Sequence, residues 1–426
     1  MYGIIDMIQG IQEGSKMDAR QERGLQIAAT CKIGRNKLGW KVPSQSGNGT
    51  YIVNLDHGKP FCTCPDFEKT AQPCKHIHAV EYVIQRETGP NRSTTYAQSI
   101  KLTCTQDWPA YNEAQTHETE RFTELLHELC KGIVQPVQTF GRPRLPLADI
   151  VFSATLKEYS TMSGRRAISN LKGCQSKGYL SKTPHYNSIF GYLENPTLTP
   201  ILKELIEESA IPLKAVEIDF AVDSSGFSTS VYGRWYDAKY GKVRKENKWI
   251  KAHLMCGVKT QVVTSVEVTP TETADAPQFA GLVKATAQNF PIHEVSADKA
   301  YSSKKNLKTV DGVGGTAYIP FKNRTTGVGH EFDNLWNKMW HFYMFNRETF
   351  LQHYHKRSNA ETTFSMIKGK FGGSVRSKSP IAQVNEVLCK VLCHNICVLI
   401  QSIYELGIEP TFWAESLVAQ KVTPNS

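Results

Sequence analysis

The sequence predicts an α/β protein in which a mixed sheet is flanked by helices, preceded by a small metal-binding module and a helical middle segment. Three observations predict this architecture. Strand and helix patterns alternate after Ala215, three cysteines and a histidine follow metal-site spacing over residues 62–76, and three short helical patterns occupy residues 148–195. Alternating strands and helices are typical of a layered α/β domain.

Length and charge narrow the class of protein. The chain has 426 residues, 40% of them hydrophobic and 10% aromatic, which suits two to four globular domains. The net charge is +10, and the positive charges are clustered: residues 142–187 contain eight Lys and Arg but two acids, and residues 356–378 contain six and one. Such clusters indicate a polyanionic partner such as nucleic acid. A single cluster alone is more often a solvated basic face.

Cysteine usage and hydropathy indicate the compartment. Eleven cysteines are too sparse, and odd in number, for a disulfide scaffold. The N-terminus lacks the basic start and apolar run of a secretory signal. The most apolar segment, residues 381–406, is interrupted by polar and charged side chains and is typical of a buried core helix. We therefore expect a cytoplasmic protein with no membrane partner.

The N-terminal module is expected over residues 1–95. Its first thirty residues give no clear element. Residues 31–55 predict two strands, with Trp40 and Val42 alternating on the first, and a Gly-Asn-Gly turn at 47–49 joins them.

The module carries the spaced pattern Cys62-x-Cys64-x9-Cys74-x-His76. Thiolate and imidazole ligands in two close pairs suit a closed, tetrahedral structural zinc site. The alternative is a set of buried cysteines beside an accidental histidine. Because four protein ligands leave no open position, we expect zinc to support folding and the recognition of DNA or a partner rather than catalysis.

Residues 96–145 are expected to be a helical linker that contains one amphipathic helix at 117–133. A basic helical segment, residues 146–210, should follow. Its last helix is expected at 199–209, with Thr199 as the cap.

Two arginines distinguish this basic segment. Arg165 and Arg166 open its middle helix, where the helix N-terminus is available to phosphate. The next helix begins near His185. This arrangement is typical of a helix-turn-helix DNA-binding module, although a plain helical spacer with solvated arginines explains it nearly as well.

The α/β domain is expected over residues 211–407, with a tail at 408–426. Its aromatic-rich stretch, residues 331–352, should be helical. Strand patterns are recognised at residues 216–225, 262–269, 293–299 and 315–322.

Three carboxylates in this domain suggest a metal site. Asp223 ends an apolar strand, Asp298 follows another, and Glu361 lies on a helix expected at residues 358–369. Carboxylates that converge at one edge of a sheet hold hard divalent cations. Asp219 lies four residues before Asp223 and on the same strand face, so spacing alone does not choose between them.

Glu361 also belongs to a longer pattern, Tyr354-x2-Arg357-x3-Glu361-x6-Lys368. At 3.6 residues per turn these positions share one helix face. A carboxylate flanked by Tyr, Arg and Lys suits a site that binds metal and grips phosphate. The alternative is an ordinary i,i+4 salt bridge on a solvated helix, worth about 0.3–0.5 kcal/mol.

These segments carry a family resemblance. Residues 212–400 resemble insertion-sequence transposases of the DDE class. VDSSGF looks like the first-Asp strand of that family, SADKAYSS is similar to its second motif, DKGYDS, and YHKRSNAETTFSMIK matches its YREK signature. Ala300 and Ser303 depart from the second motif, where Gly and Asp are usual. The cysteine and histidine pattern resembles the SWIM zinc finger.

The resemblance implies an RNase H-like fold. It implies that Asp223, Asp298 and Glu361 bind two Mg²⁺ or Mn²⁺ ions, and it thereby favours Asp223 over Asp219. By the same resemblance Tyr354, Arg357 and Lys368 contact DNA phosphates or orient the site.

The implied activity is metal-dependent cleavage and strand transfer of insertion-sequence ends by a dimer or larger assembly on DNA, at the nucleoid of a prokaryotic cell. Two alternatives remain: a catalytically silent DNA-binding regulator, and a metal-dependent DNA nuclease that does not join strands.

Overall fold

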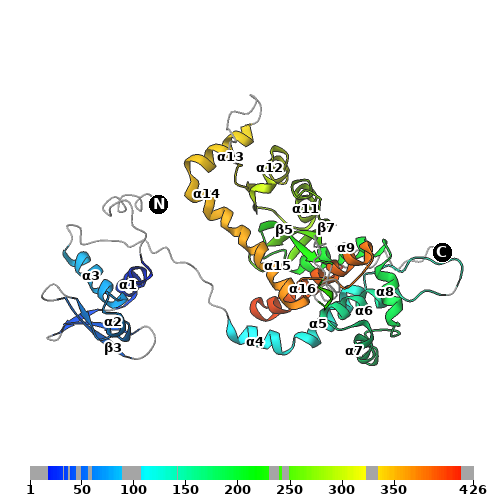
Figure 1. The fold of residues 1–426 in the computed structure, drawn as a ribbon, viewed down its shortest axis with the longest axis horizontal. Coiled ribbons are helices and arrows are strands. Elements are labelled where there is room, and N and C mark those ends of the chain that lie inside the picture. The colour runs from blue at the N-terminus through cyan, green and yellow to red at the C-terminus, as the bar shows by residue number, and fades with distance from the viewer. Residues whose placement is uncertain are drawn as a thin grey trace. The chain divides into compact units, whose positions relative to one another are not determined.

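The computed structural model describes residues 18–31, 33–36, 39–44, 49–55, 60–88, 107–141, 143–229, 239–241, 249–322 and 334–413. Its contacts divide the chain into two compact units, Met1–Thr105 and Gln106–Ser426, each with its own hydrophobic core. The predicted class is confirmed: a mixed sheet flanked by helices follows a small cysteine- and histidine-containing module (Figure 1). The boundaries expected at 145 and 210 lie inside the second unit, where helices and sheet share one core.

The first unit is built on a four-stranded antiparallel sheet in the order β1-β2-β3-β4. Trp40 pairs with Val53 and Val42 with Tyr51, so the two expected strands are confirmed. Most of the turn between them lies outside the described residues. The elements are α1 (Ala19–Thr30), β1 (Gly34–Asn36), β2 (Gly39–Pro43), β3 (Thr50–Asn54), β4 (Phe61–Cys62), α2 (Pro65–Thr70) and α3 (Lys75–Thr88).

Helix α1 was not predicted. The Gln21 side chain caps its first turn by accepting a 3.0 Å hydrogen bond from the backbone N–H of Asp18. The helix packs closely on α3 because residue 24 is glycine: a Cβ there would lie 2.7 Å from the Cβ of His78. The buried apolar residues of α1, which include Ile27 and Ala28, form a short stripe. An apolar pattern this short is hard to recognise in a sequence, so the helix was missed.

The second unit is centred on a five-stranded mixed sheet in the order β7-β6-β5-β8-β9. The first three strands form an antiparallel meander, and the last two run parallel to β5. This is the RNase H-like arrangement. Strand β6 was not predicted, because six of its nine residues are buried in succession and leave no period-two alternation. The strands are β5 (Asp219–Ser228), β6 (Trp249–Gly257), β7 (Val263–Pro270), β8 (Glu294–Ala297) and β9 (Thr316–Tyr318).

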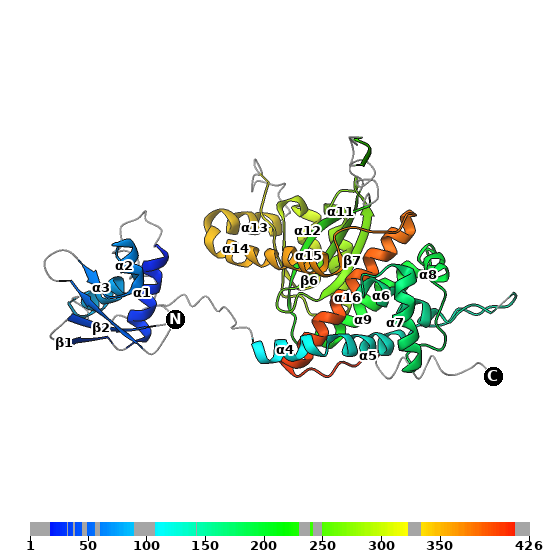
Figure 2. The same cartoon turned by 60° about the horizontal axis from the view of Figure 1, so that its bottom comes forward.

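Helix α16 (Pro380–Leu406) is the central helix of this unit and contacts α4, α5, α6, α8, α9 and β7 (Figure 2). Its length and hydropathy would suffice to cross a membrane, but 78% of its most apolar window is buried inside the protein, as expected for a core helix. The fully buried Asn395 joins three elements: it accepts a 2.8 Å hydrogen bond from the Val263 N–H and donates to Val263 O at 2.7 Å and to Ile206 O at 3.1 Å.

Several of the remaining helices were expected, but α4 (Trp108–Thr116) was not, and the helical stretch expected over residues 331–352 is divided into α13 (Asn334–Phe345) and α14 (Arg347–Tyr354). Helix α9 begins at Leu198 with Thr197 as its cap. Thr199 is not the cap, because its hydroxyl donates to Asn385 Oδ1 at 2.7 Å. The helices are α4 (Trp108–Thr116), α5 (Glu118–Cys130), α6 (Leu147–Tyr159), α7 (Gly164–Ser176), α8 (Tyr186–Leu193), α9 (Leu198–Ala210), α11 (Ala276–Asn289), α12 (Lys304–Asp311), α13 (Asn334–Phe345), α14 (Arg347–Tyr354) and α15 (Ser358–Phe371), with short 3-10 turns η2 (Ile211–Leu213), η3 (Lys299–Tyr301) and η4 (His355–Arg357).

Candidate active site and metal centres

Two of the three predicted carboxylates lie side by side on the central strands. Strands β5 and β8 are parallel, and their last paired residues are Val222 and Ala297. Asp223 and Asp298 directly follow this pair, so they lie at the same level, on backbones that are about 5 Å apart. Asp298 lies at the start of η3, where its Oδ1 accepts a 2.6 Å hydrogen bond from the Lys299 N–H.

The structure corrects one detail of this prediction. Asp223 does not end its strand, because β5 continues to Ser228 in antiparallel pairing with β6. The neighbour β8 ends instead, at Ala297. The strand edge beside Asp223 is therefore open on the β8 side only.

The third carboxylate, Glu361, is joined to Asp223 through Arg357. The guanidinium donates to Asp223 Oδ2 at 3.2 Å and to Glu361 Oε1 at 2.6 Å. The Asp223 side chain is 18% exposed and that of Glu361 56% exposed. Burial raises the pKa of Asp223, and the charges of Glu361 and Asp298 raise it further, whereas the Ser224 N–H and Arg357 oppose the increase. The two other carboxylates and Arg357 thus act in opposite directions on the pKa of Asp223.

Asp219, the rival of Asp223 in the sequence, has other partners. Its Oδ2 accepts a 2.7 Å hydrogen bond from Lys356, whose Nζ also lies 2.7 Å from Glu294 Oε2. His293 approaches the other Asp219 oxygen at 3.1 Å, and His353 contacts Glu294 at 2.8 Å. We call Asp219, Glu294 and Lys356 the lysine clamp. The clamp was not predicted; its only sequence signal is the basic pair Lys356-Arg357.

The helical segment that carries Glu361 runs along one face of β5. Its cations meet three positions on the same face of that strand: Lys356 meets Asp219, Arg357 meets Asp223, and Lys368 donates to Ser225 Oγ at 2.6 Å. Burial lowers the pKa of Lys368. Of the four positions predicted to share one helix face, Glu361 and Lys368 lie on α15, Arg357 lies in turn η4 and Tyr354 lies on α14.

The remaining predicted DNA contacts lie in two places. The Tyr354 ring centroid is 5.9 Å from the guanidinium carbon of Arg357, so it is next to the carboxylates. Arg165 and Arg166 are exposed in the first turn of α7, and the guanidinium of Arg165 lies 5.5 Å from the Tyr186 ring centroid. The structure does not bring these arginines into contact with the carboxylates.

The segment that follows α15 is fixed at both sides. The Ser228 N–H donates to Gly373 O at 3.0 Å, and the Val375 N–H donates to Ser228 O at 2.9 Å. On the other side, the buried Glu386 accepts hydrogen bonds of 2.8–3.1 Å from the backbone of Arg376 and Ser377. These bonds connect the end of β5 to α16 and hold α15 between them.

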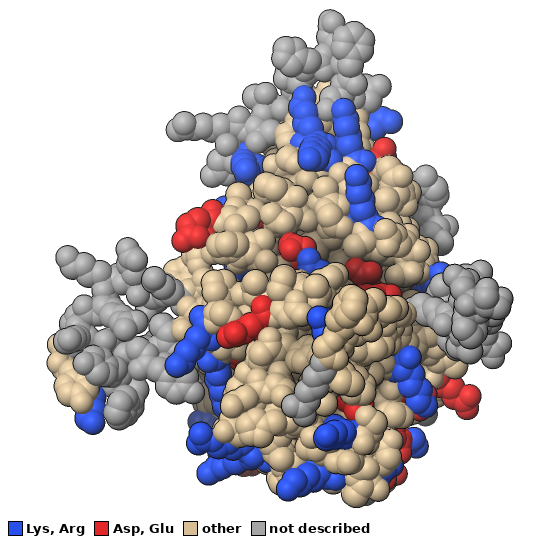
Figure 3. All heavy atoms as spheres, turned by 90° about the vertical axis from the view of Figure 1, so that its right-hand side faces the viewer, with Lys and Arg blue, Asp and Glu red and all other residues tan. Residues whose placement is uncertain are grey.

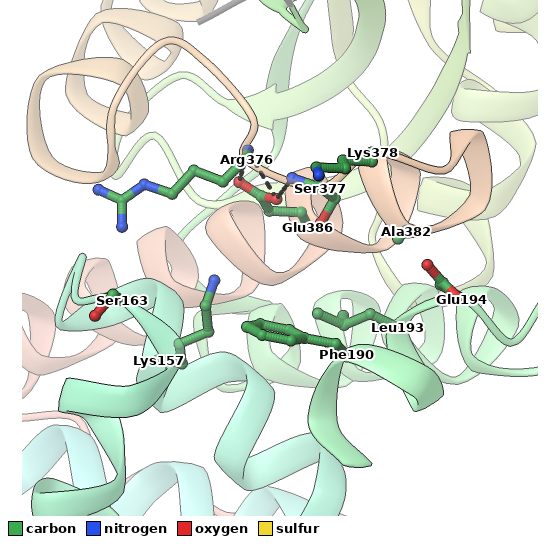
Figure 4. Close-up of a pocket in the computed structure, with 11 residues that line it drawn as sticks. Lys157, Ser163, Phe190, Leu193, Glu194, Arg376, Ser377, Lys378, Ala382 and Glu386 are labelled. Carbon is green, nitrogen blue, oxygen red and sulfur yellow. Dashed lines mark hydrogen bonds between the residues drawn. The ribbon is translucent and has the colours of Figure 1, made fainter. Parts of the chain in front are cut away.

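Beside this segment lies a cavity of about 610 Å³ between α6, α7 and α8 on one side and residues 376–386 on the other (Figure 4). Arg376 and Lys378 lie on one wall, and Lys157 and Phe190 face them from the opposite helices. The cavity separates the arginine-bearing helix α7 from the start of α16.

The first unit contains the predicted cysteine and histidine cluster. Cys62, Cys64, Cys74 and His76 are all buried, and their ligand atoms lie within 4.8 Å of one another. His76 Nδ1 is 3.9 Å from Cys62 Sγ and 3.8 Å from Cys74 Sγ. Tetrahedral zinc, with Zn–S bonds of about 2.3 Å and Zn–N bonds of about 2.0 Å, requires sulfur–nitrogen separations of about 3.5 Å.

The local fold explains this convergence. Cys62 ends β4, Cys64 caps α2 and accepts a 3.4 Å hydrogen bond from the Phe67 N–H, and His76 lies in the first turn of α3. The contact between Cys62 and Cys74 lowers the pKa of Cys74 while it raises that of Cys62. Sulfur and imidazole ligands in this geometry fit a structural zinc ion.

The carboxylate set fits a different class of ion. Asp223, Asp298 and Glu361 offer only hard oxygen ligands, which suit Mg²⁺ or Mn²⁺ rather than zinc in a closed site. The partial exposure of Asp298 and Glu361 leaves room for substrate oxygens.

Two family models match parts of the chain. Residues 214–396 match the family described as transposase DDE domain, and residues 51–85 match the SWIM zinc finger. The first match contains all three carboxylates, and the second contains all four cysteine and histidine ligands. No solved structure matches the chain.

Proposed function

We propose that this chain, which carries a transposase DDE domain and a SWIM zinc finger, cleaves insertion-sequence ends and joins them to target DNA. The observation that supports the proposal most strongly is that Asp223 and Asp298 lie at the same level of neighbouring strands, while Arg357 links Asp223 to Glu361. These carboxylates come from two strands and a helix that are far apart in the sequence. Such convergence is what a two-metal site requires.

In this proposal the three carboxylates would hold two Mg²⁺ or Mn²⁺ ions, which would supply activation of the attacking oxygen and neutralisation of charge on the scissile phosphate. Burial and the neighbouring carboxylates raise the pKa of Asp223, and Arg357 counteracts them by favouring the ionised form that can act as a ligand. When Arg357 turns away from the carboxylates, the same guanidinium becomes available to a DNA phosphate.

Other cations hold the DNA. Lys368 lies on the α15 face beside the carboxylates, and the Tyr354 ring lies against Arg357. Arg165 and Arg166 present exposed guanidinium groups at the N-terminus of α7, where helix N–H groups also favour phosphate. We assign the first group to the cut strand and the α7 arginines to the element end.

The zinc module has a structural role in this proposal. Its four ligands would complete the tetrahedral coordination of a zinc ion and leave no coordination position for a substrate. Strand transfer needs two ends at once, so we expect a dimer or larger assembly on DNA, acting at the nucleoid.

One assay tests the function and its two rivals. The protein is incubated with Mg²⁺ and a plasmid that carries the DNA flanking its gene. Joined products support a transposase, and cleavage without joining supports a nuclease. Neither product, with DNA binding retained, supports a silent regulator.

A further inference from the structure

A groove lined with lysines lies between α11 and α12, close to Asp298 in the chain. Its cationic residues are Lys284 on α11 and Lys304, Lys305 and Lys308 on α12, around a volume of about 610 Å³. Among the described residues that line it there is no carboxylate. We call it the lysine groove.

The arrangement of these lysines opposes the stability of α12. Lys304 and Lys305 occupy the first turn, where the helix dipole disfavours positive charge, and that turn contains no acid. Lys284, Lys305 and Lys308 are exposed, and all four lysines line one hollow. A polyanion that lies in the groove would offset the unfavourable interaction of Lys304 and Lys305 with the helix dipole.

The groove is fixed relative to Asp298. Asn306, which is 2% exposed, donates from Nδ2 to Tyr301 O at 2.8 Å and to Ala276 O at 3.2 Å. Tyr301 ends the η3 turn that begins directly after Asp298, and Ala276 begins α11. One buried amide therefore ties both walls of the groove to the turn beside Asp298, and a DNA held in the groove keeps a constant position relative to that carboxylate.

The charged surface shows two separate basic regions. In Figure 3, lysine and arginine side chains gather near the top, at the height of α11 and α12, and again near the bottom, at the height of α7. Both Figures 1 and 2 place α11 and α12 away from α7, with the sheet between them. The second unit thus carries two separate basic regions.

We propose that the lysine groove binds the backbone of the target DNA, an inference that rests on the proposed strand-transfer function. Its cationic side chains are all lysines, which act as point charges and lack the bidentate fork with which arginine reads guanine. Phosphate contacts of this kind carry no sequence information. Such a surface suits a DNA partner of variable sequence, whereas the element end must be recognised by its sequence.

The test compares two triple variants of the full-length protein. The groove variant is Lys284→Glu, Lys305→Glu and Lys308→Glu. The control is Lys131→Glu, Lys214→Glu and Lys259→Glu, which makes the same charge change at three exposed positions outside the groove. Each is assayed for end cleavage and for joining of pre-cleaved ends to a plasmid. We expect the groove variant alone to lose at least about tenfold in joining, with end cleavage within about twofold of wild type.

Two results would overturn the inference. Equal losses in cleavage and joining would assign the groove to the element end, and unchanged joining would remove it from DNA binding. A wild-type protein that neither cuts nor joins would refute the proposed function instead. The groove is then still tested by binding of a random-sequence duplex. In that assay the groove variant should bind the duplex more weakly and with a smaller salt dependence than wild type. A variant with Arg at the same three positions should match wild type in both respects.

Discussion

Arg357 donates a 3.2 Å hydrogen bond to Asp223, a residue 134 positions earlier in the chain. The same guanidinium holds Glu361 at 2.6 Å. Two carboxylates that would repel each other are thereby kept on one side of the sheet. The Asp223 carboxylate is therefore stabilised by a cation from a helical segment that is distant in the sequence.

Glu361→Gln should abolish cleavage and joining while DNA binding is retained. The amide keeps the size of the side chain but removes the charged oxygen that a divalent cation requires, so we expect a loss of at least about 100-fold in rate. Single-turnover cleavage in Mg²⁺ measures it. Asp219→Asn is the matched control, because Asp219 lies on the same strand face but is bound to Lys356. If the two substitutions reduce the rate equally, the ligand assignment is wrong.

Arg357→Gln should move the acid limb of the pH–rate profile to higher pH. Activity requires ionised Asp223 and is lost as pH falls through the raised pKa of that carboxyl. Arg357 lowers this pKa. Removal of the guanidinium therefore raises the pKa of Asp223 further, and the pH range in which the protein is inactive extends to higher pH. Arg357→Lys keeps the charge and should retain most of the wild-type limb. A limb that stays in place in Arg357→Gln would show that Asp223 does not limit the rate.

Lys356→Met should destabilise the second unit by about 3 kcal/mol. The substitution leaves Glu294, which is 4% exposed, without its ammonium partner, and a buried charge that loses its partner is costly. His353 still contacts Glu294 and moderates the loss. Urea unfolding at constant pH measures the change, and Lys356→Arg should recover most of it. A loss below about 0.5 kcal/mol would show that the clamp behaves as an exposed surface pair.

Much of the fold was predictable because its signals are local. The metal spacing at Cys62–His76, the alternation at Trp40 and Val42, and the common face of Arg357 and Glu361 all lie within short windows. Strand β6 was missed because a strand buried on both faces has no alternation.

The choice between Asp219 and Asp223 could not be made locally, because both residues occupy equivalent positions on one strand face. What separates them in the structure is which cation of a distant helix each one meets: Lys356 for Asp219 and Arg357 for Asp223. That pairing depends on tertiary packing, which is absent from the spacing of the residues.

Arg165→Ala combined with Arg166→Ala should weaken binding of the element end and reduce its salt dependence. Each lost phosphate contact lowers the magnitude of the slope of log affinity against log salt by about 0.9. The slope of the double variant should therefore be smaller in magnitude by about 1 to 2. Titrations at several salt concentrations measure the slope. Lys172→Ala, an exposed residue later in α7, serves as a control. An unchanged slope would support the plain helical spacer.

Chelation of zinc should unfold the first unit and leave the second intact. The first unit has a small core to which Cys62, Cys64 and Cys74 themselves belong, so loss of the ion removes a large share of its stability. Metal analysis should give about one zinc per chain. Hydrogen exchange in the presence of a strong chelator should lose protection in α3 but keep it in α16. Native protein with less than about half an equivalent of zinc would refute the assignment.

Helix α16 also has a consequence for synthesis of the protein. It is the last helix that the structure describes, yet Asn395 bonds to α9 and β7, and Glu386 fixes the segment after α15. A nascent chain that has emerged only to residue 379 contains every proposed ligand. It lacks the helix against which α9, β7 and the segment after α15 are held. The second unit therefore completes its fold only after residues 380–406 have emerged from the ribosome, and until then its apolar surfaces depend on the ribosome and chaperones for protection.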